Sequence, residues 1–133
     1  MATTAESVPA TPYHRIGGLA VLQLITDRFY DLMDSEPDFA ELRAMHAADL
    51  APMRDSLPRF LAGWSGGPRD WFEAHPGKCM ASMHAPFPIT HATADQWARA
   101  MRQAITDVAP ADQEIAVALG DVLTRMALGM AKA

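Results

Sequence analysis

Cysteine is almost absent from this chain of 133 residues. The single cysteine, Cys79, cannot form a disulfide within the chain, and no C-x-x-C pair is present that could bind zinc or carry out redox chemistry. So little cysteine is typical of a protein that works in a reducing compartment. We therefore expect a cytoplasmic protein.

Basic residues and long apolar runs are also scarce. Lysine and arginine number 11 against 16 acidic residues, and they form no cluster of the kind that nucleic-acid binding requires. No apolar stretch reaches the ~20 residues needed to cross a bilayer, and residues 1–12 lack the features of a secretory signal. We expect neither a nucleic acid nor a membrane as a partner.

The common catalytic and nucleotide-binding motifs are missing as well. The chain has no G-x-x-x-x-G-K-[ST] phosphate loop, no G-x-S-x-G nucleophile motif, no H-E-x-x-H metal motif and no EF-hand loop. Its carboxylates are scattered and do not suggest a paired acid and base. Any function must therefore depend on a less regular set of residues.

The chain does contain enough apolar material for a core. Its residues are 50% hydrophobic and 20% charged, and its length fits a single domain. Residues 1–12 are mostly small and polar, and they include Pro9 and Pro12. We expect a flexible tail over residues 1–12 and one domain over residues 13–133.

Helical periodicity runs through that domain. Apolar residues recur at spacings of three and four, and no segment alternates as a half-buried strand would, so the expected fold class is all-α. Gly17 and Gly18 would let the chain turn sharply into the first long helix. The expected helices cover residues 19–34, 35–43, 51–64, 93–108 and 110–130.

Three local features modify this pattern. Thr93 and Gln96 have the spacing of a capping box at the start of a helix. Pro58 removes a backbone hydrogen bond within residues 51–64, at a cost of ~3 kcal/mol, and this predicts a kink or a late helix start. Residues 63–90 hold so many glycines and prolines that we predict a long irregular connection, and such connections are usually functional.

The residue of most chemical interest beside this connection is His84. It lies among apolar neighbours and directly precedes Ala85-Pro86-Phe87-Pro88, whose prolines restrict the backbone. A histidine in such surroundings is most often a hydrogen-bonded structural residue. A rigid exit would equally hold the ring in one orientation, as an axial ligand of haem iron requires. The pattern alone leaves both interpretations open.

Two aromatic residues have the same ambiguity. Tyr30 ends the apolar face of the first long helix, and Trp97 begins that of a later one. Tyr30 is either a core side chain or a donor directed at a bound ligand. Trp97 is either a core side chain or part of a pocket wall, and its indole N–H needs a hydrogen-bond partner if it is buried.

Three sequence blocks become informative when they are read together. They are G-G…F-Y in the first long helix, F-L-x-G-W-x-G-G-P in the middle, and H-A-P-F-P-I…D-Q-W toward the end. In this order and spacing they resemble the group II truncated haemoglobins, from about Tyr13 onward. The resemblance implies a truncated globin fold, a two-on-two helical sandwich, that holds haem b noncovalently between its helices.

The resemblance also implies roles for individual residues. His84 matches the proximal ligand of the haem iron, and Tyr30 matches the tyrosine that donates a hydrogen bond to the bound ligand. Trp97 matches the pocket tryptophan, His46 would be a third distal polar group, and Met53 lies near the usual ligand gate. The other expected haem contacts are Leu57, Phe60, Met80, Phe87 and Ile89.

The sequence departs from the family at the haem propionates. Family members usually pair these groups with arginines just before the proximal histidine and on the distal helix, where this chain has Met80-Ala81-Ser82-Met83 and Ser56. Arg54, Arg59 and Lys78 are substitutes among which the sequence does not choose.

Three functions follow as hypotheses. The first is reversible binding of O2, NO or CO, or of small anions and peroxide in the ferric state, by a monomer or weak homodimer. Several donors imply slow oxygen release, which argues against bulk transport. The second is nitric oxide dioxygenation or peroxidase-type chemistry with an external reductase, because no flavin or nicotinamide motif is present. The third is a haem-free helical interaction module.

Overall fold

The computed structural model describes residues 11–78 and 83–132. These residues form seven α-helices and one 3-10 turn, and no strand occurs among them, which confirms the all-α prediction. The elements are α2 (Pro12–Ile16), α3 (Gly18–Ser35), η1 (Pro37–Phe39), α4 (Ala40–Ala44), α5 (Ala51–Trp64), α6 (Asp70–Ala74), α8 (His91–Val108) and α9 (Gln113–Gly129).

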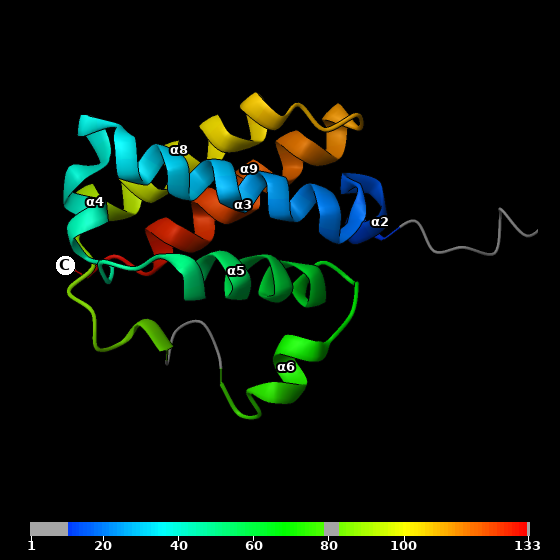
Figure 1. Ribbon diagram of the computed structural model, residues 1–133, viewed down its shortest axis with the longest axis horizontal. Helices are drawn as coiled ribbons and strands as arrows, with labels where there is room; N and C mark the ends of the chain where they lie inside the picture. Colours follow the sequence, from blue (N-terminus) through cyan, green and yellow to red (C-terminus); the bar gives the residue numbers. More distant parts are fainter. Residues whose placement is uncertain (1–10, 79–82, 133) are drawn as a thin grey trace, which may run out of the picture.

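The four long helices form two pairs. Helix α3 packs on α5, α8 packs on α9, and the contact between α3 and α8 joins the pairs. Figure 1 shows α3, α8 and α9 on one side of the molecule, with α5 and then α6 below them. The core lies between the pairs, where Ile25 and Phe29 of α3 and Ala104 of α8 are fully buried. Their spacing is the apolar periodicity visible in the sequence.

The start of α8 differs from the prediction. Its N-cap is Thr90, whose hydroxyl accepts from the backbone N–H of Thr93 at 3.1 Å, and Thr93 Oγ1 accepts from the Thr90 N–H in return. The predicted box of Thr93 and Gln96 is therefore wrong. Gln96 is buried one turn further along, and its side chain instead contacts α4. The sequence pattern favours Thr93 and Gln96, because a capping box usually has Glu or Gln as its second member, but Gln96 is instead used in the contact with α4.

Helix α5 tolerates an internal proline. It begins at Ala51, with Pro52 in its first turn, and continues through Pro58 to Trp64. The predicted alternative of a late helix start is therefore wrong, whereas a kink stays a prediction. Because proline has no N–H, the Arg54 carbonyl loses its helical donor. Burial of the Pro58 ring provides compensating apolar contact.

The connection over residues 63–90 is less irregular than predicted. It contains α6, whose Trp71 is buried with its ring centroid 5.1 Å from that of Phe60. Isolated helices this short are unstable, so packing rather than local preference explains α6. The same holds for α2, which begins at Pro12, within the range assigned to the tail, and is capped by the Thr11 hydroxyl. Residues 1–10 lie outside the described residues, so the tail stays a prediction.

The turn between α2 and α3 requires glycine. Gly17 has φ of 115° and Gly18 has φ of 74°, and a Cβ on Gly17 would clash with the side chain of Val21. This agrees with the sharp turn expected from the sequence.

We expect Gly17→Ala to lower the free energy of unfolding by about 1–3 kcal/mol, because both the backbone strain and the clash must be accommodated. Urea unfolding measures the change. The control is Gly129→Ala at the end of α9, where a Cβ meets no atom within 4 Å and φ is not positive. Equal unfolding midpoints for the two variants would contradict this account of the turn.

A search of the described helices for a membrane span gives a negative result. Not one of them combines the length and the apolar character needed to cross a bilayer.

Candidate functional site

A largely apolar cavity of about 440 Å³ lies between the helix pairs. Its walls come from α3, α4, α5, α6, α8 and α9, together with the segment that precedes α8. This volume is within the roughly 300–1,000 Å³ of typical small-molecule and cofactor sites. Across the described ranges, 11–78 and 83–132, its lining includes no acidic residue, lysine or arginine. The polar groups that reach it are therefore hydroxyl, imidazole and indole groups.

The cavity gathers nine of the ten residues singled out in the sequence. They come from five separate parts of the chain, so only the fold brings them together. The nine are Tyr30, His46, Met53, Leu57, Phe60, His84, Phe87, Ile89 and Trp97. The tenth, Met80, lies outside the described residues.

His84 enters the cavity from the segment between α6 and α8. Its side chain lines the cavity and is partly buried, and its backbone carbonyl accepts a hydrogen bond from the Phe87 N–H at 3.0 Å. The centroids of the His84 and Phe87 rings are 6.3 Å apart. Met83 and Phe87 are 37% and 45% exposed, so this segment forms part of the rim.

Tyr30 is the most buried of the polar residues at the cavity. It is 2% exposed, and its ring packs edge-on against Phe29, with centroids 4.9 Å apart. Burial raises the pKa of the Tyr30 phenol, and the nearby Arg54 opposes this only in part, so the hydroxyl stays protonated. No other described residue forms a hydrogen bond with this hydroxyl. The Tyr30 hydroxyl is therefore available as a hydrogen-bond donor at the cavity.

Trp97 provides a second donor. Its indole ring packs edge-on against Phe29, with centroids 5.2 Å apart, and it lines the cavity from the first half of α8. Its N–H likewise has no hydrogen-bond partner in the described part of the chain. Both donors thus lie against the same buried phenylalanine, which fixes their positions relative to each other.

His46 differs from these two residues because its ring N–H already donates a hydrogen bond within the protein. Its Nδ1 lies 2.9 Å from the Leu42 carbonyl oxygen, which can only accept, so Nδ1 carries the hydrogen. Burial lowers the pKa of His46; the Leu42 hydrogen bond opposes this, while Arg43 and His84 add to it. The neutral ring then has an unprotonated Nε2. His46 is polar, as the sequence suggested, but its remaining ring nitrogen is an acceptor.

Gln96 is linked to His46 through the backbone of Leu42, a role that the sequence did not indicate. Its Oε1 accepts from the Leu42 N–H at 3.1 Å, and its Nε2 donates to Glu41 at 3.2 Å. Because Leu42 also provides the carbonyl for His46, the buried amide fixes the backbone that orients the imidazole. The signal available in the sequence was a polar residue, Gln96, among the small and apolar residues that α8 buries.

Trp71 is a second residue that sequence reasoning missed. It lines the cavity from α6, stacks on His75 with centroids 4.2 Å apart, and donates from Nε1 to the Ser56 hydroxyl at 2.9 Å. Ser56 stands where the resemblance to the truncated haemoglobins implies an arginine. In this chain it connects α5 to α6 instead.

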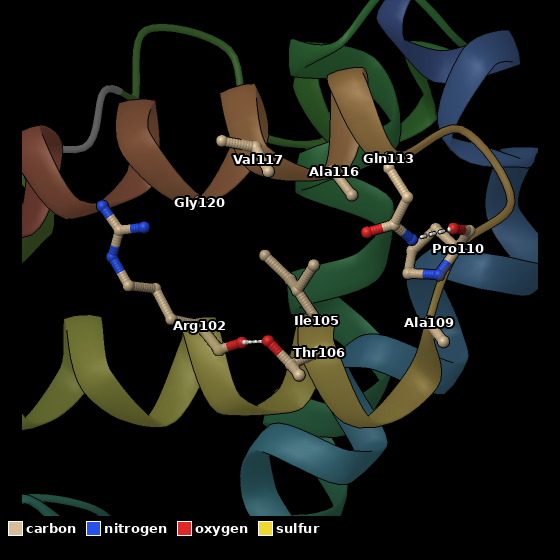
Figure 2. Close-up of a pocket in the computed structure, with 9 residues that line it drawn as sticks. All are labelled: Arg102, Ile105, Thr106, Ala109, Pro110, Gln113, Ala116, Val117 and Gly120. Carbon is tan, nitrogen blue, oxygen red and sulfur yellow. Dashed lines mark hydrogen bonds between the residues drawn. The ribbon is translucent and has the colours of Figure 1, made fainter.

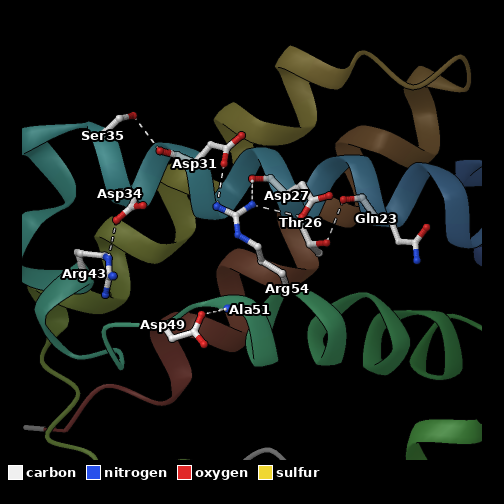
Figure 3. A network of polar contacts seen from close by, with 10 residues as sticks. All are labelled: Gln23, Thr26, Asp27, Asp31, Asp34, Ser35, Arg43, Asp49, Ala51 and Arg54. Atoms are coloured by element: carbon white, nitrogen blue, oxygen red, sulfur yellow. Dashed lines mark hydrogen bonds and ion pairs between the residues drawn. The ribbon is translucent and has the colours of Figure 1, made fainter.

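The three candidate propionate partners lie elsewhere. Arg54 donates to the Asp27 carbonyl and carboxylate and to the Asp31 carboxylate, as Figure 3 shows. Arg59 pairs with Asp55 on its own helix, and Lys78 is exposed. None of the three is among the residues that line the cavity. Arg54 instead joins α5 to α3, with its guanidinium 5.9 Å from the Tyr30 ring centroid.

A second, smaller pocket is not the ligand site. Figure 2 shows it between the end of α8 and the start of α9, with Arg102 on one side and Gln113 on the other. It has a volume of about 180 Å³, and neither an aromatic residue nor a histidine contributes to its lining in the described structure. Its polar groups are also satisfied locally, because Gln113 donates to the Pro110 carbonyl and Arg102 pairs with Asp121.

The large cavity fits haem by the chemistry of its lining. Imidazole nitrogen is a good ligand for iron, and apolar walls suit the faces of a porphyrin. Two histidines, one tyrosine, two tryptophans and the hydroxyls of a serine and a threonine line the cavity, and the rest of its wall is mostly aliphatic and aromatic. The described residues show no cluster of three or more histidine, cysteine or acidic side chains that would bind a bare metal ion.

Comparisons with known proteins identify the family. The profile of the family described as bacterial-like globin matches residues 11–131. The group 2 truncated hemoglobin YjbI of Bacillus subtilis is 34% identical over 97 residues, which cover 73% of this chain and 70% of that protein.

Solved structures agree. The group II 2-on-2 hemoglobin from Agrobacterium tumefaciens has a TM-score of 0.87 at 30% identity, over 99% of this chain and 98% of that one. The truncated oxygen-avid haemoglobin from Bacillus subtilis has a TM-score of 0.82 at 31% identity, over 92% of this chain and 99% of that one. The two helix pairs and the cavity between them are therefore those of a truncated globin. The chain belongs to the bacterial-like globin family, and within it to the group II truncated haemoglobins, so its function is haem-based ligand binding.

Proposed function

We propose that this protein binds haem b noncovalently in the large cavity, where His84 would hold the iron, and that it takes up O2 reversibly. The proposal rests on one observation. The fold brings His84, Tyr30 and Trp97 to a single cavity whose described lining has no acidic, lysine or arginine side chain. The relative described as oxygen-avid supports the choice of ligand.

Haem, when bound, would supply an iron atom able to take a nitrogen ligand from the protein and a small diatomic ligand. The chain's own residues determine how this occurs. His84 provides an imidazole nitrogen, and the hydrogen bond from the Phe87 N–H to the His84 carbonyl ties the backbone at that point. The side chains of Leu57, Phe60 and Ile89 exclude water, and this slows oxidation of ferrous iron.

The two donors set the ligand preference. Haem, when bound, would give O2 a partial negative charge and CO little, so donors at the cavity would stabilise O2 selectively. Tyr30 and Trp97 each provide one donor, and a hydrogen bond to a charged acceptor contributes ~1.5–3 kcal/mol. His46, with its acceptor nitrogen, adds no third donor toward O2. We therefore infer that O2 is released slowly and that the two donors stabilise CO less than they stabilise O2. NO and small anions would enter the same cavity.

Absorption spectroscopy tests the proposal. We expect the purified protein, reconstituted with haem, to show a Soret band, a five-coordinate ferrous spectrum without ligand, and a distinct spectrum after O2 is added. Removing O2 should restore the ferrous spectrum. A chain that acquires no Soret band after reconstitution would refute haem binding, and irreversible oxidation on the first exposure to O2 would refute reversible uptake.

A further inference from the structure

The residues that follow α9 contact the segment that carries His84. The Nζ of Lys132 donates hydrogen bonds to the carbonyl oxygens of Ala85 at 2.6 Å and Phe87 at 2.8 Å. The backbone N–H of Lys132 donates to the Ile89 carbonyl at 2.9 Å. Lys132 thus donates hydrogen bonds to the carbonyl groups of three alternate residues, Ala85, Phe87 and Ile89, directly after His84.

The contacted segment can form few hydrogen bonds of its own. Pro86 and Pro88 have no N–H. Within residues 84–89 the described backbone bonds are those from Phe87 to the His84 carbonyl and from Ile89 to the Phe87 carbonyl. Such a segment relies on outside partners for its position, and Lys132 supplies three donors to it.

The position of this segment matters for the imidazole. Phe87 and Ile89 line the same cavity as His84, and the bond from the Phe87 N–H to the His84 carbonyl transmits any displacement to the histidine. Helix α9 also lines the cavity, through Leu123 and Met126 among others. The wall of the site and the anchor of the His84 segment are therefore parts of one continuous stretch of chain.

We propose that Lys132 is a positioning residue for His84: its hydrogen bonds to Ala85, Phe87 and Ile89 fix the segment that orients the imidazole toward haem. This inference rests on the proposed function, because it assumes that His84 is the axial ligand. The ammonium group is suited to the task, since it offers three donors and is not confined to one direction.

Three variants test the role of Lys132. Lys132→Met removes the side-chain donors and keeps most of the aliphatic stem, whereas Lys132→Arg retains donors. Arg125→Met, at an exposed position on α9, removes the same charge and is the control. Lys132 is itself exposed, so the substitutions leave the core intact.

The readout is the iron–histidine stretching band in the resonance Raman spectrum of the ferrous, ligand-free holoprotein. We expect Lys132→Met to shift or broaden this band, and Lys132→Arg and Arg125→Met to retain the wild-type band. Transfer of haem to an acceptor apoprotein should be about three- to tenfold faster for Lys132→Met, as the loss of weak hydrogen bonds predicts.

The outcomes distinguish failure of the role of Lys132 from failure of the proposed binding of haem through His84. An unaltered band in Lys132→Met would overturn the inference, even with faster haem loss, because that combination indicates a purely structural contact. A wild-type protein whose spectrum contains no iron–histidine band, or keeps that band in His84→Gly, would refute the proposed function itself.

Discussion

Replacing His84 with glycine should abolish the five-coordinate ferrous spectrum, and added imidazole should restore it. Glycine leaves space where the side chain stood, and free imidazole can enter that space and ligate iron in its place. Loss of residues that merely support a metal ligand lowers metal affinity by roughly 10–100-fold. Loss of the ligand itself should lower haem affinity at least that much.

The control for this experiment is another histidine. His91 is exposed at the start of α8, so His91→Ala should leave the ferrous spectrum unchanged. Titration of each variant with haem, followed in the Soret region, gives the affinities. An unaltered ferrous spectrum in His84→Gly would mean that another residue ligates the iron. Retention of full haem affinity would carry the same implication.

Replacing Tyr30 with phenylalanine should accelerate O2 release about 10- to 150-fold, which corresponds to the ~1.5–3 kcal/mol of one hydrogen bond to a charged acceptor. The ring stays in place, because phenylalanine fills the same buried space against Phe29. CO release should change little. Stopped-flow displacement of each ligand measures both rates, with CO as the internal control.

Two further variants apportion the donors. Trp97→Phe removes the indole N–H, and its combination with Tyr30→Phe completes a double-mutant cycle. His46→Phe should accelerate O2 release much less than Tyr30→Phe, because the remaining His46 nitrogen is an acceptor. An effect of His46→Phe as large as that of Tyr30→Phe would contradict the assigned tautomer. Equal acceleration of CO and O2 release would instead indicate loss of packing.

Much of this architecture could be predicted because long amphipathic helices carry their own signal. Leu22, Ile25 and Phe29 repeat at helical spacing, and all three are buried in the structure. The glycine pair before α3 was likewise readable, because its turn needs positive φ. The family resemblance, based on three short blocks, is confirmed by the comparisons.

The features that escaped prediction depend on contacts between segments far apart in sequence. Helix α6 exists because Trp71 packs on Phe60, and no local pattern contains that information. Gln96 was assigned to a cap because its spacing fits, whereas the fold places it against Leu42, 54 residues away. The proton on His46 also follows from a carbonyl that only the folded chain brings near.

The ion pairs of Arg54 with Asp27 and Asp31 lie beside the cavity and are open to the effect of dissolved salt. These pairs join α3, which holds Tyr30, to α5, and they are partly exposed to water. Dissolved salt weakens such partly exposed pairs, although only modestly here, because their ions lie much closer together than the Debye length of roughly 8–10 Å. The described lining of the pocket has no acidic, lysine or arginine side chain, so the ionic strength of the medium would reach it mainly through these pairs on the helices that frame it.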